Sequence, residues 1–388
     1  MTYDFTYYNP TRIHFGKHAL QNLPEELAAC GDRVMLVYGG GSVKRAGIYD
    51  EIVSILTACG KSITEYGGIS ANPTADQVYA GIKLTRTHQI DFILAVGGGS
   101  VIDCAKAVAA GARTKDDFWK TFFLGKEEPE DAIELGVILT MVGTGSEMNG
   151  NAVITHPETK VKTGMWGRVC YPVFSILNPE YTYSLPPYQM VSGICDIISH
   201  VMEVYMSRPD EDNLSDDLSE AVLRNVIRNA RIAIQNPRDF VARSNLMWDA
   251  TVALSGILKC AKLQDWEVHQ IEHPLSGWYN VAHGMGLAVL SPHYYRYICP
   301  YAQARCRRFA IHVFEIDPVG KTERELEEMG IDALADFFRE LGAPATLREL
   351  GVPNDHHLKE IALSCNLYPG GYRHLTHQDI EAILRLAY

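Results

Sequence analysis

Three histidines lie within fifteen positions in the stretch VHQIEHPLSGWYNVAHGMG, which spans residues 268–286. They are His269, His273 and His283, and the stretch contains no cysteine. His269 and His273 are four residues apart, so they share one face if the segment is helical. Neutral imidazole nitrogens are common ligands of divalent transition metals. The stretch therefore indicates a metal site that needs a further ligand from elsewhere in the chain.

A second pair with helical spacing offers that ligand. In SGICDIISHVMEVY (192–205), Asp196 and His200 are four residues apart and have apolar neighbours, which predicts a buried helix. A buried carboxylate needs a partner or a metal, because burying it alone is costly. Taken singly, each pair is also explained by a structural hydrogen bond or by satisfied core histidines. Spacing alone leaves open which of His269, His273 and His283 is not a ligand.

Glycine-rich turns form the second chemical signal. GGGS occurs at residues 39–42 and again at residues 97–100, each time after a β-rich run, and GTGSE (143–147) follows a third run. Glycines let backbone N–H groups approach a phosphate, and the N-terminus of the following helix attracts negative charge. One such turn could be a plain strand-to-helix connection. Several at parallel strand ends predict a dinucleotide site.

The first turn also bears on which dinucleotide binds. Folds that select NAD often place an acid after a strand to bond the ribose 2′-hydroxyl. The run 33–38 is instead followed by glycines, Ser42, Lys44 and Arg45. This setting favours NADP, with NAD as the alternative, although Lys44 and Arg45 are equally explained as ordinary solvent-exposed helix residues.

The elements that position these residues differ between the two halves of the chain. The first half alternates β-rich runs with helical patterns (48–60 and 75–88), which predicts a mostly parallel sheet covered by helices. The expected strands are 33–38, 61–68, 91–96 and 135–142. The second half shows only helical patterns, at 192–205, 215–234, 244–258, 323–342 and 376–388. We expect an α/β domain of residues 1–186 and an all-helical domain of residues 187–388.

Composition narrows the class of partner. The chain has 388 residues, 47% hydrophobic and 21% charged, with a net charge of −12. That charge argues against a non-specific grip on nucleic acid or on an anionic membrane surface. The N-terminus lacks a signal-peptide core, and no apolar run is long enough to span a membrane. The nine cysteines never form CxxC, as is typical of free thiols in a reducing compartment, so we expect a cytoplasmic protein.

Seven blocks of the chain together resemble the iron-dependent (group III) alcohol dehydrogenase family, within it the butanol-dehydrogenase-like aldehyde reductases. The blocks are PTRIHFG, VYGGGSVKRAGIYD, GGISANPT, AVGGGSVIDCAKA, LTMVGTGSEMN, the D-x-x-x-H of residues 196–200, and HQIEHPLSGWYNVAHGMG. The resemblance implies a Rossmann-like N-terminal domain and a helical C-terminal domain, the architecture shared with dehydroquinate synthases. It also implies a catalytic divalent metal, Fe²⁺ or Zn²⁺, in the cleft between the two domains.

Carried over by position, the resemblance makes Asp196, His200, His269 and His283 the metal ligands. His273 is then the histidine that lies near the nicotinamide and relays protons. The implied cofactor residues are Gly39, Gly40, Ser42, Asn72, Gly97, Gly98, Gly99, Ser100, Asp103, Thr140, Thr144 and Lys162. The implied reaction interconverts short-to-medium primary alcohols, such as butanol, and aldehydes. Relatives of this kind are commonly dimers or larger homo-oligomers.

Two other functions fit part of the same pattern. A dehydroquinate-synthase-like lyase also combines NAD with a metal, but it needs basic residues for an anionic substrate, and no such cluster occurs near residues 244–286. A nucleotide-binding sensor with a structural metal is the other alternative. Structural sites are usually Cys-rich and coordinatively closed, and this ligand set has no cysteine. The sequence therefore favours the alcohol dehydrogenase interpretation over these two alternatives.

Overall fold

The computed structural model describes residues 3–388, which form two compact units. One unit is Tyr8–Leu185, and the other is Pro186–Tyr388 together with the described residues that precede Tyr8. The predicted domain of residues 1–186 also includes that N-terminal segment. The segment packs on the helical unit because the ring of Tyr7 lies beside Gly256.

A six-stranded parallel sheet forms the centre of the first unit, in the order β1-β8-β5-β4-β2-β3. Its fully buried strands consist of β-branched and aliphatic residues, as expected for a sheet covered on both faces. This confirms the predicted parallel sheet. The strands are β1 (Arg12–Phe15), β2 (Arg33–Gly39), β3 (Ser62–Ile69), β4 (Phe92–Gly97), β5 (Leu135–Leu139) and β8 (Phe174–Leu177).

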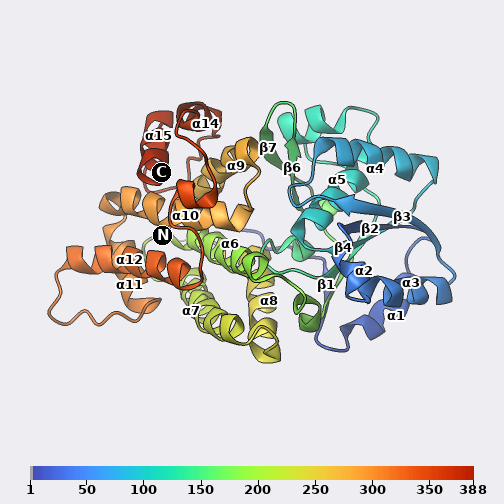
Figure 1. Cartoon of the computed structure of the whole chain (residues 1–388), viewed down its shortest axis with the longest axis horizontal. Coiled ribbons are helices and arrows are strands. Elements are labelled where there is room, and N and C mark those ends of the chain that lie inside the picture. Colours follow the sequence, from blue (N-terminus) through green and yellow to red (C-terminus); the bar gives the residue numbers. More distant parts are fainter. Residues whose placement is uncertain (1–2) are drawn as a thin grey trace. The chain divides into compact units, whose positions relative to one another are not determined.

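The order in which successive strands are added to the sheet reverses between β2 and β4. From β2 the chain moves outward to β3 and then returns to place β4 on the other side of β2. Ligands of open α/β sheets bind at the carboxyl ends of the strands at such a switch point. Helices lie on both faces of the sheet (Figure 1). They are α1 (Leu23–Ala28), α2 (Ser42–Arg45), α3 (Ile48–Ala58), α4 (Ala75–Thr87) and α5 (Gly99–Arg113).

Several elements of the first unit were not anticipated from the sequence. The strands β1 and β8 have only four residues each, too few for a clear periodic pattern. The strands β6 (Asn151–His156) and β7 (Val161–Trp166) form a separate antiparallel pair, and Lys162 lies on β7. A π-helix covers Trp119–Leu124.

The second unit is helical, and none of its described residues forms a strand, as predicted. The sequence predicts a capping box at Thr376 and Asp379, and the structure confirms it. The helices are α6 (Pro187–Tyr205), α7 (Leu214–Gln235), α8 (Phe240–Leu254), α9 (Glu267–Tyr279), α10 (His283–Ile298), α11 (Gln303–His312), α12 (Glu323–Glu340), α13 (Leu347–Leu350), α14 (Leu358–Ser364) and α15 (His377–Leu386). Among residues 3–388, no helix combines the length and the apolar character needed to cross a membrane.

Candidate metal and nucleotide sites

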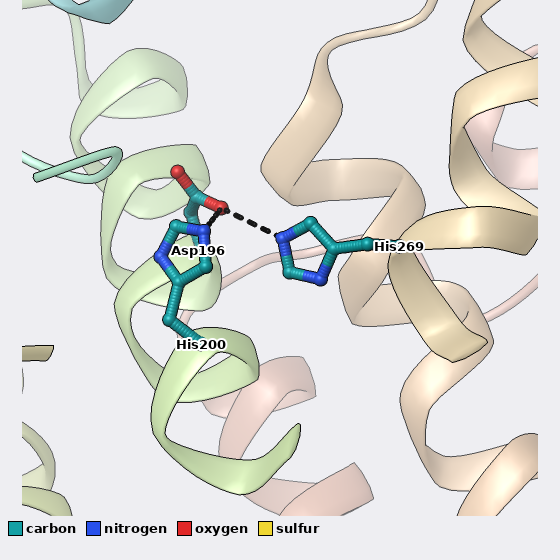
Figure 2. A group of neighbouring side chains, drawn as sticks. All are labelled: Asp196, His200 and His269. Carbon is teal, nitrogen blue, oxygen red and sulfur yellow. Dashed lines mark ion pairs between the residues drawn. The ribbon is translucent and has the colours of Figure 1, made fainter. Parts of the chain in front are cut away.

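Helix α6 carries the aspartate and the first histidine of the candidate metal site. Asp196 and His200 lie one turn apart, and both side chains are buried. Opposite them, His269 projects from α9, as Figure 2 shows. His283 is the first residue of α10. Three helices thus bring together four side chains from distant parts of the helical unit.

The four side chains converge on one oxygen atom. The Nε2 atoms of His200, His269 and His283 lie 3.5, 3.8 and 3.7 Å from Oδ1 of Asp196. These distances are too long for good hydrogen bonds. Four N and O donors arranged tetrahedrally around one zinc-sized ion stand about 3.4 Å apart, given metal–ligand bonds of about 2.1 Å. The spacing therefore suits donors that share a cation.

Two of the converging atoms are buried without a hydrogen-bond partner. Oδ1 of Asp196 and Nε2 of His269 accept or donate no hydrogen bond among the described residues. Buried polar atoms are almost always satisfied in folded proteins, and exceptions often mark an ion or a functional site. The donor set of three imidazoles and a carboxylate, with these unsatisfied atoms, fits a divalent transition metal.

Two buried glutamates hold the outer sides of the imidazoles. Glu203 accepts a hydrogen bond from Nδ1 of His269, and it also accepts the backbone N–H of His269 at 3.0 Å. Glu272 accepts a hydrogen bond from Nδ1 of His283. A carboxylate that accepts a hydrogen bond from Nδ1 keeps the proton of the neutral imidazole on that nitrogen. The lone pair of Nε2 can then bind a metal ion. The tautomer needed for binding is therefore built into the protein.

The charges in the cluster shift the titration of its members. Burial alone would raise the pKa of Asp196, but His200, His269 and His283 hold it far below its usual range. Burial alone would lower the pKa of His269, but Glu203 and Asp196 raise it to about 10. The raised pKa means that the imidazole of His269 holds a second proton when no cation is present. A cation bound at Nε2 would have to displace this proton, so its affinity would rise with pH.

Glycines allow the helices to come this close. A Cβ atom at Gly284 would overlap the carbonyl oxygen of Ser192, so only glycine lets the first turn of α10 press against α6. A Cβ at Gly286 would lie 2.9 Å from Cγ of Glu272. These two positions put His283 next to Asp196 and leave room for its glutamate.

One side of the cluster is more open than the others. The side chain of His283 is 24% exposed, whereas those of Asp196 and His269 are 6% and 8% exposed. His273 lies on this side, with its ring centroid 5.7 Å from that of His283, and is partly buried. Catalytic metal sites keep an open coordination position, and structural sites do not.

The two GGGS turns lie side by side at the switch point of the sheet. Tyr38 pairs with Val96 in the register, so Gly39 and Gly97 end adjacent strands. Gly97 and Gly98 lead directly into α5, which begins at Gly99 and has no side-chain cap, and the N-terminus of such a helix suits an anion. A Cβ at Gly99 would overlap the side chain of Thr144, so this close approach requires glycine.

Family models match both units. Residues 10–179 match "Iron-containing alcohol dehydrogenase", and residues 190–388 match "Fe-containing alcohol dehydrogenase family, C-terminal". The chain belongs to the iron-containing alcohol dehydrogenase family. It is therefore an oxidoreductase, which confirms the resemblance, the fold class and the enzyme class expected from the sequence.

Individual relatives of this alcohol dehydrogenase cover nearly its whole length. A probable NADH-dependent butanol dehydrogenase 1 of Bacillus subtilis is 40% identical over 98% of this chain and 99% of its own. The NADPH-dependent aldehyde reductase YqhD of Escherichia coli is 35% identical over 90% of this chain and 89% of its own. The crystal structure of NADH-dependent butanol dehydrogenase A from Thermotoga maritima is similar with a TM-score of 0.93 and 37% identity, covering 99% of this chain and 98% of the other.

The remaining residues expected at the cofactor site are mostly engaged within the first unit of this dehydrogenase. Asp103 accepts from Ser146 Oγ at 2.6 Å and from the backbone N–H of Val153 at 2.9 Å, so both carboxylate oxygens hold the segment after β5. Ser100 donates to the carbonyl of Ala71, next to Asn72 in the loop after β3. Thr140 follows β5, and its N–H donates to Gly97 at 3.0 Å. Lys162 is buried on β7 near Asp103, whose pKa is raised by burial and lowered by its lysine neighbours.

Four residues beside the candidate sites of this dehydrogenase are not among those predicted from the sequence. Glu203 and Glu272 were detectable, because they lie seven residues after Asp196 and three after His269 on the same helix faces. Trp266, whose ring centroid lies 5.5 Å from that of His269, carried no such signal. Glu65 is the fourth, and it holds Lys44 at 3.1 Å beside the first glycine turn.

Proposed function

We propose that this chain is a metal-dependent, nicotinamide-linked alcohol dehydrogenase that interconverts short-to-medium primary alcohols and aldehydes. The observation that carries the proposal is the convergence of three imidazole nitrogens on one unsatisfied, buried carboxylate oxygen. Relatives named as butanol dehydrogenases and as an aldehyde reductase support the substrate class. Butanol and butanal are the first substrates to test.

In this proposal, Asp196, His200, His269 and His283 hold a divalent cation, Fe²⁺ or Zn²⁺. When bound, the cation would polarise the substrate oxygen and the nicotinamide would exchange a hydride with the adjacent carbon. Glu203 and Glu272 keep the imidazole Nε2 atoms free to act as donors. Ferrous iron follows from the family's name, whereas affinity order alone favours zinc.

His273 is the proposed proton carrier. It belongs to none of the four ligand positions, yet its ring lies 5.7 Å from that of His283 on the more exposed side of the cluster. Histidine is the side chain that most readily exchanges protons near neutral pH. It would give a proton to the oxygen formed by aldehyde reduction, or take one from the alcohol in the reverse direction.

The first unit is the proposed nucleotide-binding domain, with residues 1–186 as its extent and residues 187–388 as the metal-binding domain. Gly97, Gly98, Gly99 and Ser100 would receive the pyrophosphate at the start of α5. Gly39, Gly40 and Ser42 would face the adenosine ribose, with Asn72, Asp103, Thr140, Thr144 and Lys162 around the nucleotide. NADP is favoured by the absence of an acid at position 39, where the chain has glycine, with NAD as the alternative.

A cytoplasmic homodimer or larger homo-oligomer completes the proposal. All nine cysteines are free thiols, which suits a reducing compartment. Neither nucleic acid nor a membrane is a proposed partner, in keeping with the net charge of −12.

The test is turnover by protein of known metal content. Purified protein reconstituted with Fe²⁺ or Zn²⁺ is mixed with NADPH or NADH and butanal, and absorbance of the reduced nicotinamide is followed. We expect consumption that a chelator abolishes. The H269A variant should lose both metal and turnover, whereas H293N, which changes a histidine further along α10, should keep both. Metal-loaded protein that consumes neither nucleotide with a panel of short aldehydes and alcohols would refute the proposal.

A further inference from the structure

The ammonium group of Lys44, which follows the first glycine turn, contacts a carboxylate and two aromatic rings. Its Nζ lies 3.1 Å from Oε2 of Glu65, a residue on β3. It also lies over the rings of Tyr38 and Tyr49, at 4.7 and 4.1 Å from their centroids. Three separate contacts therefore hold the flexible lysine side chain in one place.

The contacts lie beside β2 rather than beyond its end. Glu65 is opposite Leu36 in the parallel register, three residues before the turn begins at Gly39. Oε2 of Glu65 accepts the hydroxyl of Tyr38 at 2.6 Å, which anchors the carboxylate to the strand. The ring of Tyr38 fits there because residue 67 is glycine. A Cβ at that position would lie 2.5 Å from the ring. The carboxylate that holds the ammonium is thus anchored on β3, at a level of β2 that precedes the glycine turn.

The carboxylate is charged at neutral pH. Hydrogen bonds from Tyr38 and Tyr49 and the ammonium of Lys44 lower the pKa of Glu65 to about 2. Its negative charge cancels that of Lys44, so the pair adds no net charge beside the turn. By contrast, Arg45 lies close to the turn, with Nη1 3.6 Å from the position of a Cβ on Gly41. Arg45 forms no ion pair with any carboxylate of residues 3–388.

We propose that Glu65 sets the coenzyme preference of this chain by withholding Lys44 from the 2′-phosphate of NADP. The inference rests on the proposed nucleotide site at the two glycine turns. Where β2 and β4 end side by side, the pyrophosphate belongs at the start of α5 and the adenosine ribose at the neighbouring turn after β2. A lysine three residues past Gly41 reaches a phosphate there once its carboxylate partner is gone. The two cations near the turn are thereby reduced to one, Arg45.

The decisive variant is E65Q, which keeps an oxygen for the tyrosine hydroxyls and removes the charge that holds Lys44. The pair is about half exposed, so the substitution leaves the core intact. We expect the ratio of the NADH dissociation constant to the NADPH dissociation constant to rise about tenfold, as for one added phosphate contact. Calorimetric titration of both nucleotides, without substrate and without added metal, measures this ratio independently of turnover.

Two further variants identify the cause. In the double variant E65Q/K44M the gain should disappear, because no released ammonium remains. In D32N, the ratio should equal that of the unmodified protein. Asp32 forms a matched ion pair with Lys61 at 2.8 Å, at the opposite end of the same two strands. It therefore controls for the loss of one carboxylate.

The outcomes separate the inference from the function on which it rests. A ratio in E65Q within twofold of the original, or a gain that survives in E65Q/K44M, overturns the role of Glu65 while the nucleotide site stands. Failure of every variant, and of the unmodified protein, to bind either nucleotide overturns both the role and the proposed site.

Discussion

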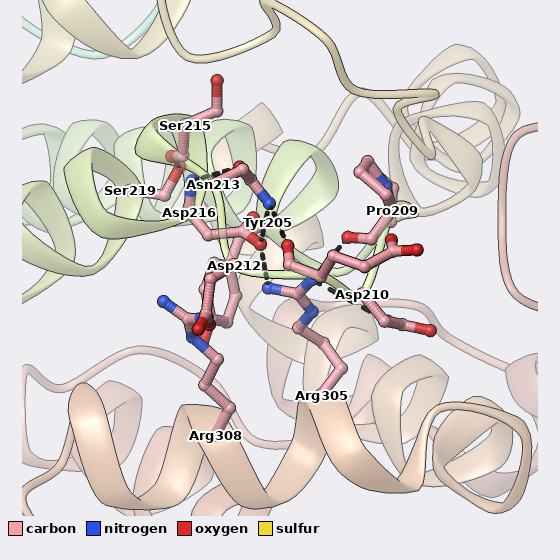
Figure 3. Close-up of polar contacts among 12 residues, drawn as sticks. Tyr205, Pro209, Asp210, Asp212, Asn213, Ser215, Asp216, Ser219, Arg305 and Arg308 are labelled. Carbon is pink, nitrogen blue, oxygen red and sulfur yellow. Dashed lines mark hydrogen bonds and ion pairs between the residues drawn. The ribbon is translucent and has the colours of Figure 1, made fainter. Parts of the chain in front are cut away.

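Two groups of buried charges in the helical unit differ in how their members meet. Around Asp216 the partners are in contact: Lys262 Nζ and Arg305 Nη1 each lie 2.6 Å from one of its carboxylate oxygens. Figure 3 shows Asp216 with Arg305. Around Asp196, the nearest histidine nitrogens stay 3.5 to 3.8 Å from one oxygen. Both carboxylates are buried, but only the first is satisfied by the protein itself.

The difference separates a charge cluster whose carboxylate has protein partners from the cluster proposed to bind a cation. Lys262 also donates to the carbonyl of Ser207 at 2.8 Å, and Arg305 donates to that of Pro209 at 2.7 Å. These bonds tie the end of α6 to α7 and α11. Both carboxylate oxygens of Asp216 accept hydrogen bonds from the protein, from Asn213 and Lys262. The histidine cluster leaves two polar atoms unsatisfied, and a cation would satisfy both.

The largest expected effect, on turnover, comes from removing Asp196 from the proposed metal site. D196A should lower turnover about a thousandfold or more, because the several kcal/mol of charge stabilisation that a metal supplies would be lost. Metal content, measured by elemental analysis, should fall from near one equivalent to near zero. Nucleotide affinity should be unchanged. A D196A protein that retains its metal would show that the four side chains are not its ligands.

Breaking the closed cluster should instead cost stability. D216A leaves Lys262 and Arg305 buried without their carboxylate, and such losses cost about 3–5 kcal/mol. The free energy of unfolding, measured with denaturant, should fall by that amount. Protein that still folds should bind metal normally, since no ligand contacts Asp216. If D196A destabilises the metal-free protein as much as D216A does, the distinction between the clusters fails.

The glutamates behind the imidazoles should have an intermediate effect. E203Q and E272Q replace the acceptor at Nδ1 with a neutral amide and so weaken the tautomer preference of His269 and His283. Such changes typically reduce metal affinity about 10- to 100-fold. Competition with a chelator of known affinity measures the change. Loss that appears only in turnover, at unaltered metal affinity, would contradict this role.

A third buried carboxylate, Asp249, forms no ion pair among the described residues, although the charge of Arg228 acts on it, and its pH dependence extends the comparison. Asp249 accepts only from Asn225, at 3.0 Å, among the described contacts. Burial raises its pKa to about 7, and the amide opposes this only in part. The folded protein therefore binds more protons than the unfolded chain between about pH 4 and pH 7. Through that window, this residue's contribution to stability falls as pH rises.

D249N should remove that dependence. Its free energy of unfolding should exceed that of the unmodified protein at pH 7.5 by about 1–3 kcal/mol and match it more closely near pH 4.5. Denaturant unfolding at several pH values measures both curves. Equal pH slopes for the two proteins would mean that Asp249 ionises normally. D239N, which changes the partly buried N-cap residue of the same helix, is the control.

Much of this arrangement was readable from the sequence because it rests on local spacing. The four-residue interval between Asp196 and His200 places both on one helix face, and the glycine turns after β-rich runs indicated the strand ends. The resemblance chose His283 over His273 as a ligand; spacing alone could not, since both lie near His269. The parallel sheet followed from alternating strands and helices.

What escaped prediction depends on contacts between distant segments. Lys44 and Glu65 meet only because β2 pairs with β3 in one register, and nothing local in either segment fixes that register. Likewise, Asp216 and Arg305 are 89 residues apart, and each alone resembles an ordinary surface charge. The strands β1 and β8 are too short to show periodicity. Contacts between distant segments, rather than local propensity, determine the Lys44–Glu65 pair, the Asp216–Arg305 pair and these two strands.

The four converging side chains and their two glutamates all lie after Pro186. During synthesis, every strand of the sheet therefore leaves the ribosome before the first of these six residues does. Domains generally fold as they emerge, so the nucleotide half can mature in a cell starved of the cation. In the proposed function the cation would bind after both units have been synthesised, so its supply would govern how many finished molecules become active.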